Sequence, residues 1–480
     1  MRILFKRPDG STRTGWLGIA LFIVSFSVFF LSPRNSAMSD PKYSMLLSES
    51  LLMRQTPALN SFSIPGLDPA RLSSAQSPTP GHSQLTRING RIVYAYPWGT
   101  SVLSLPFVAA LNALGLSAAR RDGSYNQTGE IWIQKIIACL LMSVTTCLFF
   151  RTAVLLLPIS WSVVLAAAGA LSTQIWSTAT RALWSHTWDV FLGSWVIFIL
   201  LSVEERRSRL RATLLATLVS WMYIVRPTSA LDVIAISIFM FMFYRDKFLV
   251  WTGTGVFWLI IFCIYSLWAF GTIFPIYNQL FHFFRVRNCL TALAGILISP
   301  SRGLILFVPP ITMVVFLVAF HWRYLPHRRL GVLAIAVVLA EIFMVSAWPW
   351  WWGGWSFGPR LLTDTVPWLM LLAILGCAAL LKYCAADGST MTHATYKNSL
   401  VSLGLFLICV GIAINGIGAI SREAGSWNEQ EDIDAHPERV WDWHHPQFFS
   451  KISREDWTPH RFDAPERRDS PAAGASPVTK

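Results

Sequence analysis

Long apolar stretches separated by short polar ones dominate the pattern of this chain. Each runs for about 20 residues with almost no charge, which is the length that a helix needs to cross the hydrocarbon core of a bilayer. We count eleven such stretches, which begin at Trp16, Ile131, Trp161, Trp188, Ala212, Ser229, Leu249, Gly303, Leu330, Leu361 and Leu400. The pattern predicts an all-α polytopic membrane protein with about eleven transmembrane helices.

Composition and charge exclude the other broad classes. The 480 residues are 54% hydrophobic and only 14% charged, whereas an average soluble domain has about a quarter charged residues. The net charge of +13 falls in short clusters between apolar stretches, so it does not indicate a nucleic-acid surface. The seven cysteines show neither a disulfide framework nor metal-ligand spacing. No small-residue cleavage site follows the first stretch at Ser32-Pro33-Arg34, so we expect it to remain as an anchor.

The positions of lysine and arginine predict the orientation, because basic short loops remain cytoplasmic. Four basic clusters are expected inside: 2–13, 206–211, 245–247 and 323–329. Eleven spans fit this rule only if the apolar piece Pro97–Leu116 does not cross. This piece contains proline and glycine, and we interpret it as a helix along the outer interface. The N-terminus is then cytoplasmic and the C-terminus exterior, in a multi-pass protein of the cell inner membrane.

The same pattern predicts three regions. Residues 1–420 form a transmembrane domain whose first exterior loop, 32–129, is its longest. Residues 421–460 mix tryptophans with carboxylates and are expected to fold back onto the exterior face. The tail 461–480 is rich in proline, alanine, serine and charge without periodicity, so we expect it to be disordered.

The first candidate for chemistry lies where the chain leaves the first span. Asp40 stands beside Lys42 and is followed by a helical pattern from Met45 to Met53. A carboxylate next to a cation suits proton abstraction from an acceptor and contact with a phosphate. The alternative is that Asp40 caps this helix, with Pro41 at its first position.

A second acidic candidate lies at the start of the fourth span. Asp189 could orient an acceptor or a cation, and His186 could hydrogen-bond to it. An N-capping aspartate and an interfacial histidine explain the pair equally well. Asp232 and Glu341 lie within spans, where a structural partner is as plausible as a functional role.

Exterior arginines form the third candidate set. They are Arg226, Arg285, Arg287, Arg302 and Arg360. Arg302 and Arg360 stand beside glycine or proline turns, where a guanidinium can bind a phosphate with two hydrogen bonds. Contact with lipid headgroups is the alternative for any one of them. Five arginines on the exterior face of the protein favour an anionic ligand.

These motifs resemble those of the GT-C superfamily of polytopic glycosyltransferases, in particular relatives of protein O-mannosyltransferases and of the lipid A aminoarabinose transferase. The resemblance rests on Asp40-Pro41-Lys42-Tyr43, on Tyr96-Pro97-Trp98-Gly99, and on Asp189 at the outer end of the fourth span. Many members have two acidic residues where this chain has Asp40-Pro41.

The resemblance implies transfer of a hexose or pentose from a polyprenyl-phosphate donor to a lipid, glycan or protein acceptor on the periplasmic side. Asp40, with Asp189, would supply the catalytic carboxylates. The substrate-binding set would be Lys42, Tyr43, Tyr96, His186, Arg226, Arg302 and Arg360. No cofactor is required by this scheme, and a divalent metal is possible.

Two other functions remain open. A polymerase or ligase of lipid-linked glycans is also embedded and rich in exterior arginines, but its large exterior loop usually comes late in the chain. A transporter or flippase of lipid-linked sugars usually has inverted repeats and paired intramembrane charges. Neither feature is evident in this sequence.

Overall fold

The computed structural model describes residues 11–69, 72, 82–202, 209–275, 277–278, 289–386 and 390–457. The tail 461–480, the candidates Arg285 and Arg287, and much of the basic clusters at 2–13 and 206–211 lie outside the described residues.

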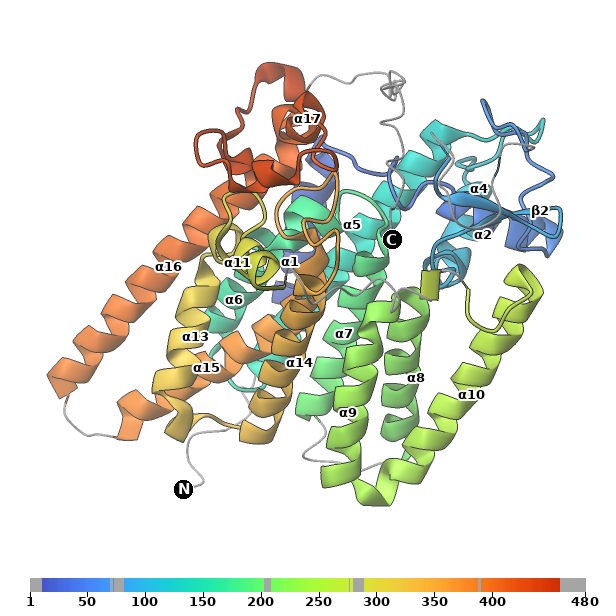
Figure 1. Cartoon of the computed structure of the whole chain (residues 1–480). Coiled ribbons are helices and arrows are strands. Elements are labelled where there is room, and N and C mark those ends of the chain that lie inside the picture. The colour runs from blue at the N-terminus through green and yellow to red at the C-terminus, as the bar shows by residue number, and fades with distance from the viewer. Residues whose placement is uncertain are drawn as a thin grey trace, which may run out of the picture.

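The described chain is a bundle of helices (Figure 1). By length and composition, seven of the described helices can cross a membrane. These are α1 (Ser11–Leu31), α5 (Gln127–Val154), α7 (Ser185–Ser202), α10 (Arg245–Phe270), α14 (Arg328–Ser346), α15 (Val366–Ala386) and α16 (Thr390–Ile420). The shorter apolar helices are α6 (Ile159–Leu171), α8 (Arg209–Val225), α9 (Ala230–Phe243), α11 (Cys289–Ile298) and α13 (Pro310–Phe320). The all-α, multi-pass architecture is confirmed.

Each predicted apolar stretch contains a helix, but the count of eleven spans stays a prediction because several of these helices are short. The stretch from Gly303 is divided into α12 (Leu304–Phe307) and α13. Pro309 and Pro310 stand at this break, where their missing N–H groups interrupt helical hydrogen bonding. α11 was not predicted, since it lies in a segment expected to be an exterior loop.

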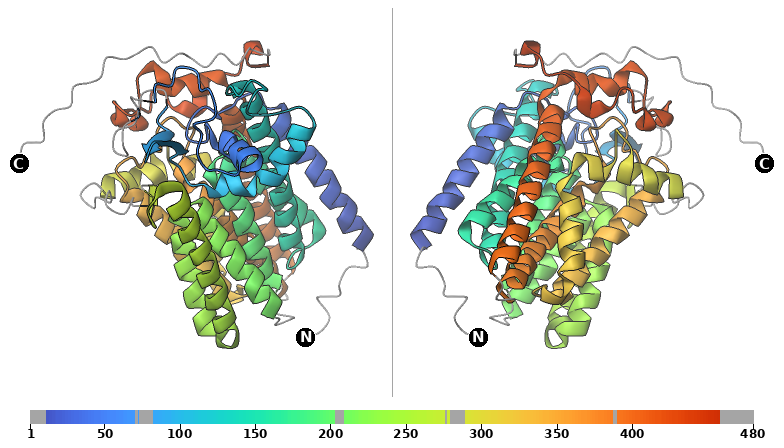
Figure 2. Two further views of the ribbon diagram at one scale, coloured as in Figure 1. Left: turned by 90° about the vertical axis from the view of Figure 1, so that its right-hand side faces the viewer. Right: turned by 90° about the vertical axis from the view of Figure 1, so that its left-hand side faces the viewer.

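Loops and short elements gather at one end of the bundle, and α1 begins at the other (Figures 1 and 2). The gathered elements include α2 (Ser44–Arg54), α3 (Gly99–Leu103), α4 (Leu105–Ala113) and α17 (Arg422–Gln430). We call this the loop end. It collects the segments that the sequence assigns to the exterior, although the membrane side of each end stays a prediction.

The piece Pro97–Leu116 forms α3 and α4, and the longer of these has 9 residues. At 1.5 Å per residue such a helix is far too short to cross a bilayer. The buried carboxylate of Glu49 on α2 holds the region, because it accepts hydrogen bonds from Asn112, Ser117 and the backbone N–H of Ala118. The structure therefore agrees with a helix that does not span.

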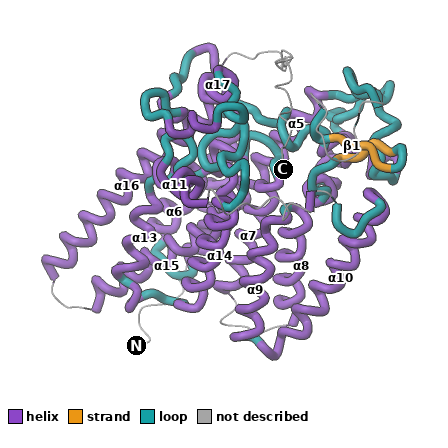
Figure 3. The backbone as a smooth tube through the Cα atoms, viewed as in Figure 1, coloured by secondary structure: helices purple, strands orange, loops and turns teal. Residues whose placement is uncertain are grey.

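A β-hairpin in the first loop was not predicted (Figure 3). Strands β1 (Leu85–Ile88) and β2 (Arg91–Tyr94) pair antiparallel, with Leu85 opposite Tyr94. The two turn residues, Asn89 and Gly90, have φ values of 49° and 78°. An Asn-Gly pair in this left-handed conformation makes a tight turn whose twist matches that of the two flanking strands. The dipeptide could therefore have predicted the hairpin from the sequence.

Cysteine labelling can test the orientation. Arg121 is exposed in the first loop, and Arg323 is exposed beyond α13, in a cluster that the sequence assigns to the cytoplasm. In a parent without native cysteines, we expect Arg121→Cys to react with an impermeant maleimide in intact cells. Arg323→Cys should react only after the membrane is opened. The reverse pattern would invert the assigned orientation.

Candidate active site

A cavity of about 650 Å³ lies at the loop end. Its wall is built by the first loop, the start of α7, the α8–α9 junction, the segment from Trp348 to Leu361, and one residue of the C-terminal segment. Five of the residues predicted from sequence line it: Asp40, Tyr96, His186, Arg226 and Arg360. The fold thus brings together groups that are far apart in the chain.

Proline and glycine place the two arginines. Pro227 follows Arg226 directly, and the residue before a proline avoids helical geometry. α8 accordingly ends at Val225, and Arg226 is extended with φ −148° and ψ 107°. Gly358 has φ +63° and precedes Pro359, so the chain turns sharply just before Arg360 opens a short 3-10 helix. Both guanidinium groups therefore lie at helix ends that border the cavity.

Asp40 forms the centre of the polar wall. Its Oδ2 accepts a hydrogen bond of 2.8 Å from Arg360 Nη1, and its side chain is 40% exposed. The Tyr96 hydroxyl lies 3.5 Å from Asp40 Oδ1, and the Tyr94 hydroxyl donates to the Asp40 carbonyl at 2.9 Å. The charge of Asp40, followed by burial, raises the pKa of Tyr96, so this hydroxyl stays protonated and can donate.

The structure excludes the helix-cap interpretation of Asp40. No side chain of the first turn caps α2. The buried carboxylate of Glu130, on α5, instead accepts from the backbone N–H groups of Tyr43 at 3.0 Å and Met45 at 2.8 Å. Asp40 is therefore not needed for the helix start, and its carboxylate faces the cavity.

Lys42 and Tyr43 do not line the cavity. Tyr43 is buried, and its hydroxyl lies 2.8 Å from His82 Nδ1. The Lys42 ammonium lies 4.9 Å from the centre of the Tyr43 ring. Both residues lie in the loop that carries Asp40. They are not among the proposed substrate contacts.

Asp364 joins two of the predicted site residues and was not itself predicted from the sequence. Its Oδ1 lies 2.8 Å from His186 Nδ1, and its Oδ2 accepts from Arg226 Nε. Arg226 also donates through Nη1 to Ser185 Oγ at 3.2 Å. All three ionisable groups are buried, where charges require partners. One feature of the sequence could have identified Asp364 as a candidate. It is a carboxylate at the start of an apolar span, in Thr363-Asp364-Thr365.

Asp189 lies behind this wall. It is buried, its Oδ1 accepts a 2.7 Å hydrogen bond from Ser229 Oγ, and it is not among the residues that line the cavity. The hydrogen bond ties α7 to the turn between α8 and α9. His186 pairs with Asp364 and not with Asp189, contrary to the pairing considered from sequence.

Arg302 is also outside the cavity wall, with its side chain buried. A guanidinium has five N–H donors. All five are used: Nε bonds to Trp352 O, Nη1 to Ser301 O and Gln447 Oε1, and Nη2 to Gly354 O and Asn428 Oδ1. No donor remains for a phosphate, so Arg302 fastens the tryptophan-rich loop to the C-terminal segment instead.

Several buried polar atoms on the cavity wall have no hydrogen-bond partner among the described residues. They are Arg360 Nε, Trp184 Nε1, Thr100 Oγ1 and Thr228 Oγ1. The Arg360 guanidinium stacks 4.4 Å from the centre of the Trp184 ring. Buried donors in native proteins are nearly always satisfied, so these point to a ligand. No grouping of three or more His, Cys, Asp or Glu in the described residues could hold a metal ion.

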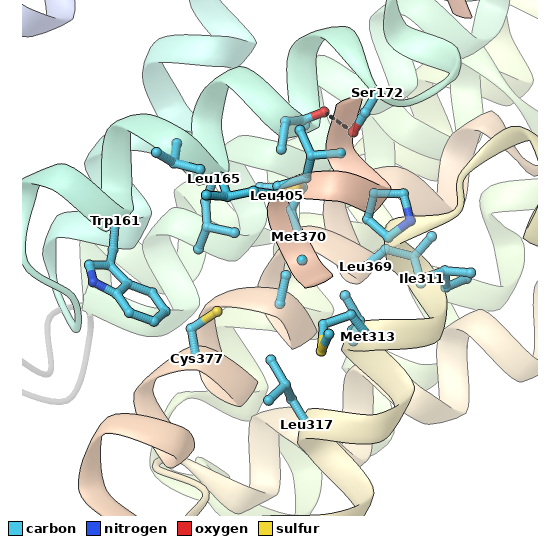
Figure 4. A pocket seen from close by; sticks show the side chains of 18 of the residues that line it. Trp161, Leu165, Ser172, Ile311, Met313, Leu317, Leu369, Met370, Cys377 and Leu405 are labelled. Carbon is cyan, nitrogen blue, oxygen red and sulfur yellow. Dashed lines mark hydrogen bonds between the residues drawn. The ribbon is translucent and has the colours of Figure 1, made fainter. Parts of the chain in front are cut away.

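A second cavity, of about 280 Å³, lies between α6, α13, α15 and α16 (Figure 4). Leu165, Ile311, Leu317 and Met370 are typical of its lining. The hydroxyl of Ser172 on its border is satisfied by the carbonyl of Ala168 at 2.7 Å. The described residues that line this cavity carry no charged side chain.

Comparisons with known proteins were informative only for structure. No family model matches the chain, and no curated protein matches it. Among solved structures it is similar to ArnT from Cupriavidus metallidurans, in the apo state and bound to undecaprenyl phosphate. The two structures are 13% and 12% identical to this chain, cover 87% of it and 79% and 80% of their own chains, and each has a TM-score of 0.47.

Proposed function

We propose that this protein is a membrane glycosyltransferase that moves a sugar from a polyprenyl-phosphate donor to an acceptor at the exterior face. The main observation that supports this proposal is the Asp40–Arg360 salt bridge on the wall of a large cavity at the loop end. A carboxylate and a guanidinium side by side are the two groups that such a transfer needs. The carboxylate takes a proton, and the guanidinium binds the phosphate that leaves.

The proposed reaction is a direct displacement. The acceptor hydroxyl attacks the anomeric carbon while its proton passes to Asp40. The bond between that carbon and the phosphate oxygen breaks, and the electron pair stays with the polyprenyl phosphate. Arg360 would hold the leaving phosphate, because its side chain lines the cavity and its Nε has no hydrogen-bond partner among the described residues.

Arg226 and His186, which also line the cavity, would bind the same phosphate. Asp364 fixes both side chains through its two carboxylate oxygens, so their orientation is set before substrate arrives. Binding of phosphate to Arg360 would also weaken its hold on Asp40. The carboxylate would then become a better base only when the donor is present.

The location of the cavity supports a donor that is dissolved in the bilayer. The cavity is bordered by Ile234 of α9 and by Met344 and Val345 of α14, in addition to its polar wall. A polar head could therefore reach Asp40 while an isoprenoid tail stays beside apolar helices. This arrangement is the reason to prefer a lipid-linked donor over a water-soluble nucleotide sugar.

Substitution of Arg360 tests the proposed function. We expect Arg360→Ala to weaken binding of undecaprenyl phosphate by about tenfold or more, since one charge-assisted hydrogen bond is worth about 1.5–3 kcal/mol. Binding can be measured by microscale thermophoresis on the purified, detergent-solubilised protein.

The matched control is Arg87→Ala, because Arg87 is half-exposed on β1 and outside the cavity wall. Equal affinity in Arg360→Ala and wild type would remove Arg360 from the phosphate site. Release of free polyprenyl phosphate with formation of a new glycosidic bond separates a transferase from a flippase, which leaves the glycosidic bond intact.

A further inference from the structure

The C-terminal segment contributes one residue, Asp434, to the wall of the same cavity. The neighbouring Ile433 is fully buried with Trp352, Trp427 and Val440, so the backbone at this point is anchored. Asp434 Oδ1 accepts a 2.9 Å hydrogen bond from Trp352 Nε1. Its Oδ2 has no hydrogen bond within the described chain, and the side chain is exposed. A fixed carboxylate with one available oxygen therefore stands at the rim.

The other side of this rim is aromatic. Trp350 lines the cavity and keeps 48% of its surface exposed, with the ring of Trp348 5.8 Å away. An indole face beside a polar group offers a packing surface for a ligand that is rich in C–H bonds. The segment that contains both tryptophans accepts hydrogen bonds from Arg302 through the carbonyls of Trp352 and Gly354.

A glycine pair links the rim to the proposed reaction centre. Gly353 and Gly354 have φ values of 76° and 62°, a conformation that favours glycine. A Cβ on Gly354 would lie 3.7 Å from Asp434 Oδ1, and a Cβ on Gly353 would lie 3.8 Å from Arg360 Nε. Asp434 and Arg360 therefore flank one turn, with the arginine toward the inner wall and the carboxylate toward the outside.

We propose that Trp350 and Asp434 form a subsite for a sugar ring of the acceptor, so that the acceptor is a carbohydrate-bearing molecule. The C–H bonds of a sugar carry partial positive charge and pack on the negative face of an indole. Its hydroxyls donate to a carboxylate. Arg360 and Arg226 are assigned to the donor phosphate, which leaves the outer rim for the second substrate. This inference rests on the proposed sugar transfer.

Ligand-observed NMR tests the subsite without depending on turnover. The probes are methyl glycosides of glucose, mannose, galactose, N-acetylglucosamine and arabinose, with tetramethylammonium as a cationic competitor for an aromatic-carboxylate site. The purified protein is kept in a detergent without sugar headgroups. We expect saturation transfer from the wild-type protein to at least one glycoside, and a decrease of this signal to about a fifth or less in Trp350→Ala and in Asp434→Asn.

Asp432→Asn is the matched control. Asp432 lies two residues away, is exposed and does not line the cavity, and an asparagine keeps the oxygen that accepts from Trp355 and from the Asp434 N–H. Glycoside binding should persist in this variant. Undecaprenyl phosphate should bind Asp434→Asn as tightly as wild type, which shows that the variant is folded and that the donor site is separate.

Two results would overturn the subsite. One is the absence of saturation transfer to every glycoside, and the other is saturation transfer to tetramethylammonium in place of the glycosides. Glycoside binding that persists unchanged in both Trp350→Ala and Asp434→Asn would also place the sugar elsewhere. If instead glycosides bind as expected but wild type forms no glycosidic bond from lipid-linked donors, the transferase proposal fails and the sugar subsite stands.

Discussion

Asp40→Asn should lower sugar transfer by about a hundredfold or more, which is the usual contribution of a positioned general base. The amide has nearly the same shape and still offers an oxygen to Arg360, but it cannot accept a proton. Transfer can be followed with radiolabelled lipid-linked sugar from membranes of the source organism. Both the rate and the thermal midpoint of the purified variant should be measured.

Stability should change little, which separates chemistry from folding. The Asp40–Arg360 salt bridge involves a side chain that is 40% exposed, and such pairs contribute about 0–1 kcal/mol. Glu130, not Asp40, caps α2, so the helix start is unaffected. Asp122→Asn, an exposed carboxylate on the same loop, is the control and should keep full activity.

Retained transfer in Asp40→Asn would remove Asp40 from the mechanism. On the described part of the cavity wall, Asp434 would then be the remaining carboxylate. Asp189 and Glu49 are weaker replacements, because both are buried and neither lines the cavity.

Arg302→Met should cause the largest loss of stability. The substitution removes five hydrogen bonds from a charged group and leaves buried acceptors on Asn428 and Gln447 without this donor. Hydrogen bonds of charged groups contribute about 1.5–3 kcal/mol each, so a total of at least about 3 kcal/mol is expected even after relaxation. The C-terminal segment would lose its main polar connection to the tryptophan-rich loop.

This loss of stability can be measured by thermal unfolding that is monitored by size-exclusion chromatography. Arg121→Met is the control, because Arg121 is exposed at the same loop end. Arg302→Lys should also be destabilised, because an ammonium cannot reproduce the planar fork. Undecaprenyl phosphate should still bind the fraction that remains folded. A stable Arg302→Met protein with weakened phosphate binding would instead restore the role that the sequence alone suggested for this arginine.

The pattern of apolar residues along the chain determined the transmembrane architecture. A stretch such as 131–150 is apolar over the thickness of a bilayer, and a helix is the structure that satisfies its own backbone hydrogen bonds in lipid. Pro97–Leu116 was excluded as a span by the alternation that the basic clusters impose and by its proline and glycine, and the structure forms α3 and α4 there. These predictions depend on neighbours along the chain, so no tertiary contact was needed to make them.

The roles of individual polar residues depended on the tertiary structure. Arg302 and Arg360 stand in similar glycine- and proline-bounded turns, so the sequence suggested the same role for both. Arg360 forms a salt bridge with Asp40, 320 positions away in the chain. Arg302 donates to Gln447, 145 positions away, and its other N–H groups also donate to acceptors within the protein. Asp364 became visible as the partner of His186 and Arg226 only once three segments were brought together.

The sequence by itself therefore determined an all-helical protein that crosses the membrane many times and carries polar groups at one end. A transmembrane span is a property of one continuous apolar segment, which is why it can be read along the chain. The tertiary structure decided which carboxylate and which guanidinium face the cavity. A polar side chain takes its function from whichever donors or acceptors remain unsatisfied around it, and those partners come from distant segments.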